Sequence, residues 1–189
     1  PVGNCSYSDI TIFSFHPVKI ITTAEGGAAL TNDPDLAKKM TLHRSHGITR
    51  DEKDMTETSH GPWYYQQITL GYNYRMTDLQ AALGISQLTR LSDYVSTRHQ
   101  LANRYNTLLK NFPLKIPYQS ENTYSALHLY VIRLKLEEIT FSHKEVFETL
   151  RENKIGVNLH YIPVHIQPYY KAMGFNDGDF PESEKYYHE

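Results

Sequence analysis

Lys19 has the side chain and the sequence setting of a nucleophilic amine. It stands between Val18 and Ile20 in an apolar run that reads as extended chain. Burial among apolar groups disfavours the charged ammonium, lowers the pKa of a lysine and frees the amine to attack a carbonyl. The pattern therefore predicts a Schiff-base lysine. A lysine at a strand edge whose charged end reaches solvent fits the same sequence.

Three other polar residues have side chains that suit a phosphate-bearing ligand. Ser14 precedes Lys19 by five residues, which span roughly 16 Å of extended chain, so we expect no direct contact between the two side chains. They could still hold opposite ends of a ligand, but an ordinary strand or turn serine is the commoner explanation of Ser14. Asn73 and Arg75 stand before a predicted helix N-terminus, where anions are favoured, and arginine offers a planar fork of donors. A turn asparagine and a solvated arginine fit these positions equally well.

A second cluster of polar residues surrounds a proline late in the chain. It consists of His160, Tyr161, Pro163 and His165. No third metal ligand stands at a useful spacing, so we expect no metal site. Structural histidines at a strand end are the commoner explanation of such a cluster. Glu25, beside two glycines, is either an acid or base or an ordinary turn carboxylate.

The elements that would position Lys19 read as a strand, a hairpin and a helix. Residues 10–15 alternate like a strand, and residues 20–23 and 28–31 flank a glycine turn like the arms of a hairpin. A helix follows, because a capping aspartate precedes a proline at residues 33–34 and Gly47 provides a stop.

The segment around Asn73 leads into a long helix. Residues 63–70 alternate like a strand, and Thr77 with Gln80 forms a capping box. Apolar residues then recur at helical spacing as far as Phe112, with a bend expected near residues 91–92.

The second half of the chain reads as a small α+β unit after a proline-bearing linker. Ser142 and Glu145 form another capping box. The remaining expected elements are strands at 126–135 and 157–161 and a short helix at 167–173. We therefore predict an α/β chain with one domain over residues 1–112 and a small one over residues 113–189.

Composition excludes several classes of partner. The 189 residues carry a net charge of −2, which gives no electrostatic reason to bind nucleic acid or an anionic membrane. No apolar run has the length of a membrane-spanning helix. The one cysteine, Cys5, cannot form an intrachain disulfide and fits a reducing compartment, so we expect a cytoplasmic protein.

Four blocks of the sequence together resemble the DegT/DnrJ/EryC1/StrS family of sugar aminotransferases. The family's lysine segment is similar to residues 14–19 followed by Glu25-Gly26-Gly27. The other blocks are residues 44–47, residues 71–77 with Gln80-Ala81-Ala82, and residues 160–163. They occur in family order and span most of the chain. The sequence of residues 22–25 is most similar to that of family members that act in pseudaminic acid biosynthesis.

The resemblance implies a fold, a cofactor and a reaction. The fold would be the aspartate-aminotransferase fold (type I) of pyridoxal 5'-phosphate (PLP) enzymes, here the end of the large domain and a truncated small domain. The reaction would be transamination of a nucleotide-linked 4-keto-6-deoxy sugar, such as a UDP-linked HexNAc, with an amino donor such as glutamate. Family members are homodimers with shared active sites.

The resemblance also assigns roles to individual residues. Lys19 would form the internal aldimine with PLP, and Ser14 would bind the cofactor phosphate. Asn73 would reach the phosphate of the partner subunit's cofactor. The nucleotide sugar would be held by His16, Arg75, Asn158, His160 and Tyr161.

Some family features are not found in this sequence. In the family an Asp-x-x-His block, which supplies the acid for the pyridinium nitrogen, precedes the lysine segment, but only 18 residues precede Lys19. We therefore expect a C-terminal fragment that exposes apolar surface and is inactive alone. Two alternatives stay open: a PLP-dependent sugar dehydratase, which would carry histidine in place of Lys19, and a non-catalytic family member that binds PLP or a sugar for regulation.

Overall fold

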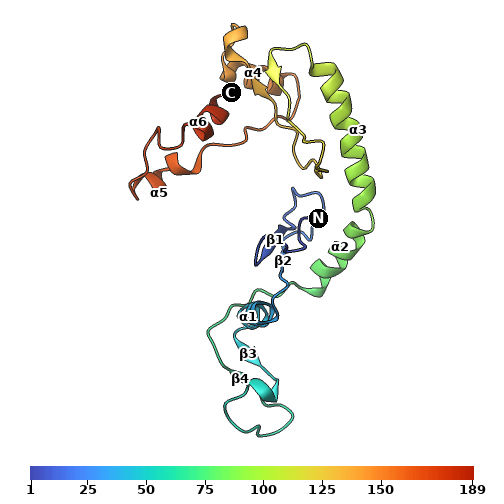
Figure 1. Ribbon diagram of the computed structural model, residues 1–189, viewed down its shortest axis with the longest axis vertical. Helices are drawn as coiled ribbons and strands as arrows, with labels where there is room; N and C mark the ends of the chain where they lie inside the picture. The colour runs from blue at the N-terminus through green and yellow to red at the C-terminus, as the bar shows by residue number, and fades with distance from the viewer. The chain divides into compact units, whose positions relative to one another are not determined.

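The chain divides into two compact units that are described separately. The computed structural model describes residues 1–189, and its units are Pro1–Tyr94 and Val95–Glu189 (Figure 1). The division falls inside helix α3 (Leu91–Leu109). The domain boundary expected at residue 112 stays a prediction. No helix combines the length and apolar character needed to cross a membrane.

The first unit begins with an antiparallel hairpin whose arms differ from the prediction. Strand β1 (Thr11–Ser14) lies within the expected strand, but it pairs with β2 (Gly27–Leu30). Residues 20–23 are not a hairpin arm, because Thr22 and Thr23 both donate hydrogen bonds to the Phe15 carbonyl and fold that segment back into the β1–β2 loop. Lys19 therefore lies in a loop rather than in a strand.

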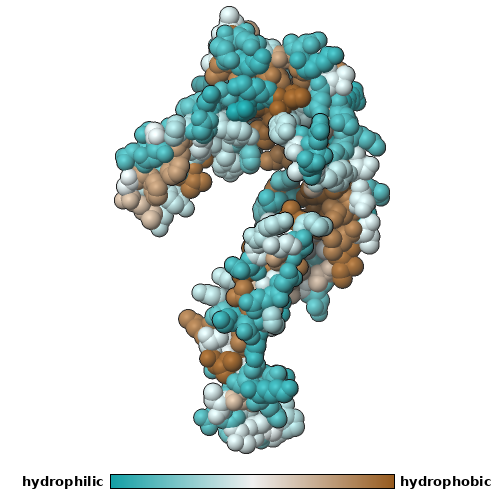
Figure 2. Space-filling model, in the orientation of Figure 1, coloured by the Kyte–Doolittle hydropathy of each residue, from teal (hydrophilic) through white to brown (hydrophobic).

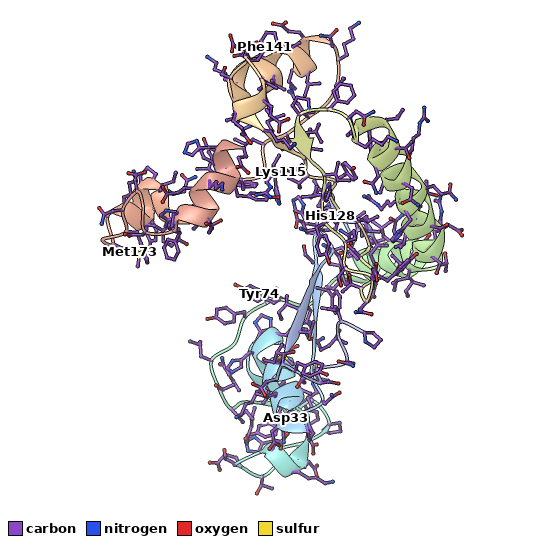
Figure 3. All side chains as sticks on the ribbon, turned by 45° about the horizontal axis from the view of Figure 1, so that its top comes forward. Asp33, Tyr74, Lys115, His128, Phe141 and Met173 are labelled. Atoms are coloured by element: carbon purple, nitrogen blue, oxygen red, sulfur yellow. The ribbon has the colours of Figure 1, made fainter.

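Helix α1 (Pro34–Arg44) begins as the sequence predicts. The carboxylate of Asp33, labelled in Figure 3, accepts hydrogen bonds from the amides of Asp35 and Leu36. The helix ends at Arg44, and Gly47 follows with a φ of +70°. A Cβ at Gly47 would overlap the Thr69 carbonyl oxygen, so glycine is required there.

The segment after α1 contains little regular structure. Strand β3 (Ile48–Thr49) pairs with β4 (Gln66–Gln67), and a short 3-10 helix, η1 (Glu52–Asp54), lies between them. The strand expected over residues 63–70 is therefore confirmed for only two residues. Gly47 explains part of the shortfall, since its carbonyl accepts the amides of both Ile68 and Thr69 and its φ of +70° is not that of an extended strand.

The expected long helix is two helices, α2 (Asp78–Leu88) and α3. The capping box predicted at Thr77 and Gln80 is present. The break falls next to the bend expected at residues 91–92. Thr89 lies at this break, where its hydroxyl donates to the Ser86 carbonyl, a local bond that competes with the helical ladder.

The second unit contains one short sheet and helix α4. Strand β5 (Leu114–Lys115) pairs with β6 (Arg133–Leu134), and 3-10 helix η2 (Leu136–Glu138) follows. Helix α4 (His143–Glu152) starts at the predicted capping box of Ser142 and Glu145. The predicted strand at residues 157–161 has no strand pairing.

The expected strand at residues 126–135 is confirmed only in β6. Side chains of α3 take the carbonyls that a longer ladder would need: Arg98 donates to Leu127 and His128, and His99 contacts the Ser125 carbonyl. Leu127 also has a φ of 50°, which is incompatible with an extended strand.

The end of the chain is organised by a buried histidine. The remaining elements are η3 (Val164–Ile166), α5 (Pro168–Lys171), which lies within the helix expected over residues 167–173, and α6 (Pro181–His188). His165 in η3 is 7% exposed, packs on the Phe180 ring and places Nε2 2.8 Å from Glu184 Oε1 in α6. Glu184 also accepts the Gly178 amide at 2.7 Å.

Apolar burial in both units is slight. Ala102, Leu127 and Pro163 are the only buried residues with apolar side chains, whereas α2 exposes Leu79, Ile85 and Leu88. Figure 2 shows the brown apolar surface over this helix. The expected exposure of apolar surface is confirmed, and local hydrogen bonds therefore carry much of the order in these units.

We expect Gly47→Ala to destabilise the full-length protein by about 3 kcal/mol or more, because the new Cβ would overlap Thr69 and strain the positive φ. Gly156→Ala is the matched control, since a Cβ there meets nothing within 4 Å. Urea unfolding followed by circular dichroism measures both. Equal effects of the two substitutions would contradict the packing at Gly47.

We also expect acid to loosen the contact between η3 and α6. The His165 ring and the Gly178 amide donate to Glu184 and hold its pKa below the ordinary 4.5. Because the folded-state pKa of Glu184 is depressed, its contacts stabilise the folded protein at pH values above the unfolded-state pKa. This stabilisation is lost as the pH falls through the folded-state pKa.

Glu184→Gln should therefore lower the thermal midpoint of the full-length protein at neutral pH and flatten its decline below about pH 4.5. Glu182→Gln, on the exposed first turn of the same helix, is the control. Identical pH profiles for the wild type and Glu184→Gln would contradict this role.

Candidate active site

The loop that carries Lys19 is closed at its neck by backbone hydrogen bonds. The Phe15 amide donates to the Gly26 carbonyl at 2.8 Å, and the Thr23 amide donates to the Phe15 carbonyl at 3.0 Å. The Thr22 hydroxyl donates to the same carbonyl at 3.0 Å. Lys19 is half-buried between these closures. The hairpin therefore presents the lysine on a loop with two fixed ends.

Three of the predicted site residues lie in one run of local hydrogen bonds. The Ser14 hydroxyl accepts the His16 amide at 3.4 Å, and His16 Nδ1 accepts the Val18 amide at 3.4 Å. The His16 carbonyl accepts the Lys19 amide at 2.9 Å. Each contact fixes the backbone two or three residues further on. The structure thus brings Ser14, His16 and Lys19 together in a single turn.

Thr23 is a positioning residue that the sequence reasoning missed. It is 3% exposed, and its hydroxyl donates to the Glu25 carbonyl at 2.7 Å. Its methyl group faces helix α2, where a Cβ at Gly84 would lie 2.8 Å from Thr23 Cγ2. The sequence signal that could have found it was Gly84, because a glycine inside a helical pattern often marks a place where another segment packs closely.

The segment that contains Asn73 is attached to the end of α1. Asn73 forms a β-bridge with Ser45, and the amides on either side of it also bond to this region. Tyr72 donates to the His43 carbonyl at 2.7 Å, and Tyr74 donates to the Arg44 carbonyl at 3.0 Å. Tyr74, labelled in Figure 3, stacks on Tyr72 with ring centres 4.9 Å apart. Two of the four sequence blocks are thus joined by hydrogen bonds.

Two open cavities of the first unit meet at Arg75. One, of about 310 Å³, also has Arg44 and Glu25 in its lining, together with Gly26, Gly27, Tyr74, Met76 and Gln80. The other, of about 450 Å³, is lined by Ser45, His46, Ile48, Arg50, Tyr65 and Arg75. Arginine side chains in both cavities suit an anionic group such as a phosphate.

The remaining predicted site residues lie in the second unit. Asn158 and His160 line a cavity of about 440 Å³ that includes the aromatic residues Tyr105, Phe147 and Tyr186. Tyr161 is 67% exposed and is not part of that lining. The structure therefore groups two of these three residues.

The sequence as a whole has a family match. Residues 1–189 match the model of the DegT/DnrJ/EryC1/StrS aminotransferase family. The chain belongs to this family. The spore coat polysaccharide biosynthesis protein SpsC of Bacillus subtilis, a similar protein, is 39% identical over 185 residues, which are 96% of this chain and 47% of SpsC.

A second similar protein carries the name of a specific transaminase. The UDP-4-amino-4,6-dideoxy-N-acetyl-beta-L-altrosamine transaminase of Campylobacter jejuni is 40% identical over 171 residues, 88% of this chain and 42% of that protein. This chain spans about half the length of the curated relatives it matches.

Two solved structures described as aminotransferases show the same fold. Helicobacter pylori PseC, described as an aminotransferase involved in the biosynthesis of pseudoaminic acid, matches with a TM-score of 0.81 and 31% identity over 96% of this chain and 46% of PseC. The PLP form of Spr1654 from Streptococcus pneumoniae matches with a TM-score of 0.84 and 29% identity over 98% of this chain and 46% of that one. The chain therefore has part of the α/β aminotransferase fold, as the sequence predicts.

We expect Thr23→Val to destabilise the full-length protein by about 1 to 2 kcal/mol, because it removes the donor to Glu25 from a buried position. Thr41→Val is the matched control, since Thr41 also bonds a carbonyl, that of Ala37, but on an exposed helix face. Chemical unfolding measures both. A larger loss for Thr41→Val would contradict the anchoring role of Thr23.

Proposed function

We propose that the full-length protein carrying this sequence is a PLP-dependent sugar aminotransferase. It would transfer an amino group to C4 of a nucleotide-linked 4-keto-6-deoxy sugar, a UDP-linked HexNAc, with glutamate as the amino donor. The names of the relatives support a role in surface-polysaccharide or pseudaminic acid biosynthesis. The observation that carries the proposal is Lys19 in a loop closed at both ends, within a chain that matches the family throughout.

The residues of the β1–β2 loop fit PLP chemically. The Lys19 amine takes part in none of the ion pairs of the structure, so no carboxylate holds it away from a carbonyl. The Ser14 hydroxyl is exposed and accepts from the His16 amide, which leaves its proton for donation to a phosphate oxygen. Lys19 would hold the cofactor covalently, and Ser14 would hold its phosphate.

The proposed reaction divides its work between the cofactor and the lysine. When bound, PLP supplies the electron sink that stabilises negative charge at the reacting carbon. The Lys19 amine would carry the proton between the cofactor carbon and sugar C4, which requires a base that cycles between amine and ammonium. The amino donor and the sugar would use the site in turn, so the kinetics would be ping-pong.

The other predicted residues would hold the nucleotide sugar or a second cofactor. Arg75 would meet the sugar diphosphate from the arginine-lined cavities. Asn158, His160 and Tyr161 would contribute from the second unit, and His16 from the Lys19 turn. A homodimer, in which Asn73 reaches the phosphate of the partner subunit's cofactor, and a cytoplasmic location complete the proposal.

Lysine at position 19 disfavours the dehydratase alternative, because those relatives carry histidine at the corresponding position. A regulatory protein that binds PLP or a sugar remains the second alternative. Turnover distinguishes it from the enzyme: the full-length protein should convert glutamate and a UDP-linked 4-keto sugar. PLP binding without turnover of several such sugars would favour the regulatory protein.

We expect the full-length protein to develop the visible absorbance of lysine-bound PLP, and Lys19→Ala to abolish it. Turnover should fall by about 100-fold or more, because the group that moves the proton is lost. Lys39→Ala, at an exposed lysine of α1, is the control and should keep the absorbance. An unchanged spectrum for Lys19→Ala would show that the cofactor lysine lies elsewhere.

A further inference from the structure

The two ring nitrogens of His16 have different partners. Nδ1 lies 3.4 Å from the Val18 amide, which is a donor, so Nδ1 must act as the acceptor. The proton of the neutral ring then resides on Nε2. Nε2 faces the carboxylate of Glu25, with 3.8 Å between Nε2 and Oε1. The ring therefore lies between a backbone donor on one edge and a negative charge on the other.

The contact between His16 and Glu25 is suited to orientation rather than to stability. A distance of 3.8 Å is longer than a hydrogen bond, so the carboxylate acts through its field or through a bridging water. The side chains are 48% and 73% exposed, and exposed pairs add little to folding free energy. A negative charge facing Nε2 nevertheless favours the tautomer that carries its proton on that nitrogen.

The backbone at Glu25 is held in place by its neighbours. Its carbonyl accepts the hydroxyl of buried Thr23 at 2.7 Å. The next residue, Gly26, has a φ of +152°, and a Cβ there would lie 2.7 Å from Met76 Cε. The backbone that carries the Glu25 side chain is thus fixed by contacts that do not involve His16.

We propose that Glu25 is a positioning residue for Lys19. It holds His16 in the tautomer protonated at Nε2, so that Nδ1 keeps the Val18 amide and the turn presents the Lys19 amine in one geometry. The opposite tautomer would place a proton on Nδ1 against the Val18 proton and release the turn. The catalytic part of this inference rests on the proposed function of Lys19.

A direct role of Glu25 at the ligand is the alternative that the test must separate from positioning. It lines the same cavity as Arg44 and Arg75, where a carboxylate could act on the ligand or on an arginine. Such a role would not depend on His16. Positioning through His16 would disappear once the imidazole is replaced.

The test uses four variants of the full-length protein. Glu25→Gln removes the charge, and His16→Asn replaces the ring by an amide oxygen that can accept the amide two residues on, without tautomers. The third variant combines both changes, and Glu57→Gln, at an exposed carboxylate of the same unit, is the control. Nitrogen-15 NMR of the cofactor-free protein reports the His16 tautomer, and steady-state kinetics report kcat.

We expect the Nε2-protonated form to dominate in the wild type and a mixture of tautomers in Glu25→Gln. The kcat of Glu25→Gln should fall by about threefold to tenfold, which is the size of effect of one weak contact. In the His16→Asn background the same change should have no further effect on kcat. Glu57→Gln should behave as the wild type.

Two results would overturn the inference. One is an unchanged His16 tautomer in Glu25→Gln. The other is a loss of kcat that is equally large with and without the histidine, which would assign Glu25 to the ligand or to Arg44 and Arg75. Absence of turnover in the wild type would overturn the proposed function instead, since the tautomer is measured without cofactor.

Discussion

The first unit depends on the burial of one small side chain, Thr23. Its amide closes the loop neck on Phe15, its hydroxyl fixes Glu25, and its methyl group packs on Gly84 of α2. Three kinds of interaction therefore meet at one residue. Because apolar burial is slight elsewhere, this junction is what connects the loop of Lys19 to a helix. A loop of this kind keeps its geometry through its ends, while its middle stays accessible to a ligand.

Residues of the β1–β2 loop differ in whether they serve ligand binding or stability. Ser14 and His16 are exposed, and the hydrogen bonds that they accept are local. They therefore orient the backbone of the loop and add little to the free energy of folding. Thr23 is buried and contributes anchoring. Lys19 lies between these extremes, half-buried in the middle of the loop. A reactive amine needs this combination, since it must be oriented by the protein and still reach a bound carbonyl.

The sequence predicted local features well and non-local features poorly. The cap at Asp33 and the boxes at Thr77 and Ser142 are present because a cap depends on three or four neighbouring residues. The hairpin arm at residues 20–23 was wrong because β-formers were read without knowledge of the ladder partner. The family blocks supplied the predicted site residues, whose roles stay predictions. Thr23 was missed because its burial depends on the approach of a distant helix.

The attachment of Asn73 to α1 separates its position in space from its position in sequence. Asn73 precedes α2 by a few residues, yet its bridge is to Ser45, and its neighbours bond to the last turn of α1. The position of Asn73, the residue proposed to serve a second subunit, is thus fixed by hydrogen bonds to the end of α1. Substitutions that restore the position of a displaced Asn73 are therefore expected among residues 42–47. Substitutions in α2 are expected to change the position of Asn73 less.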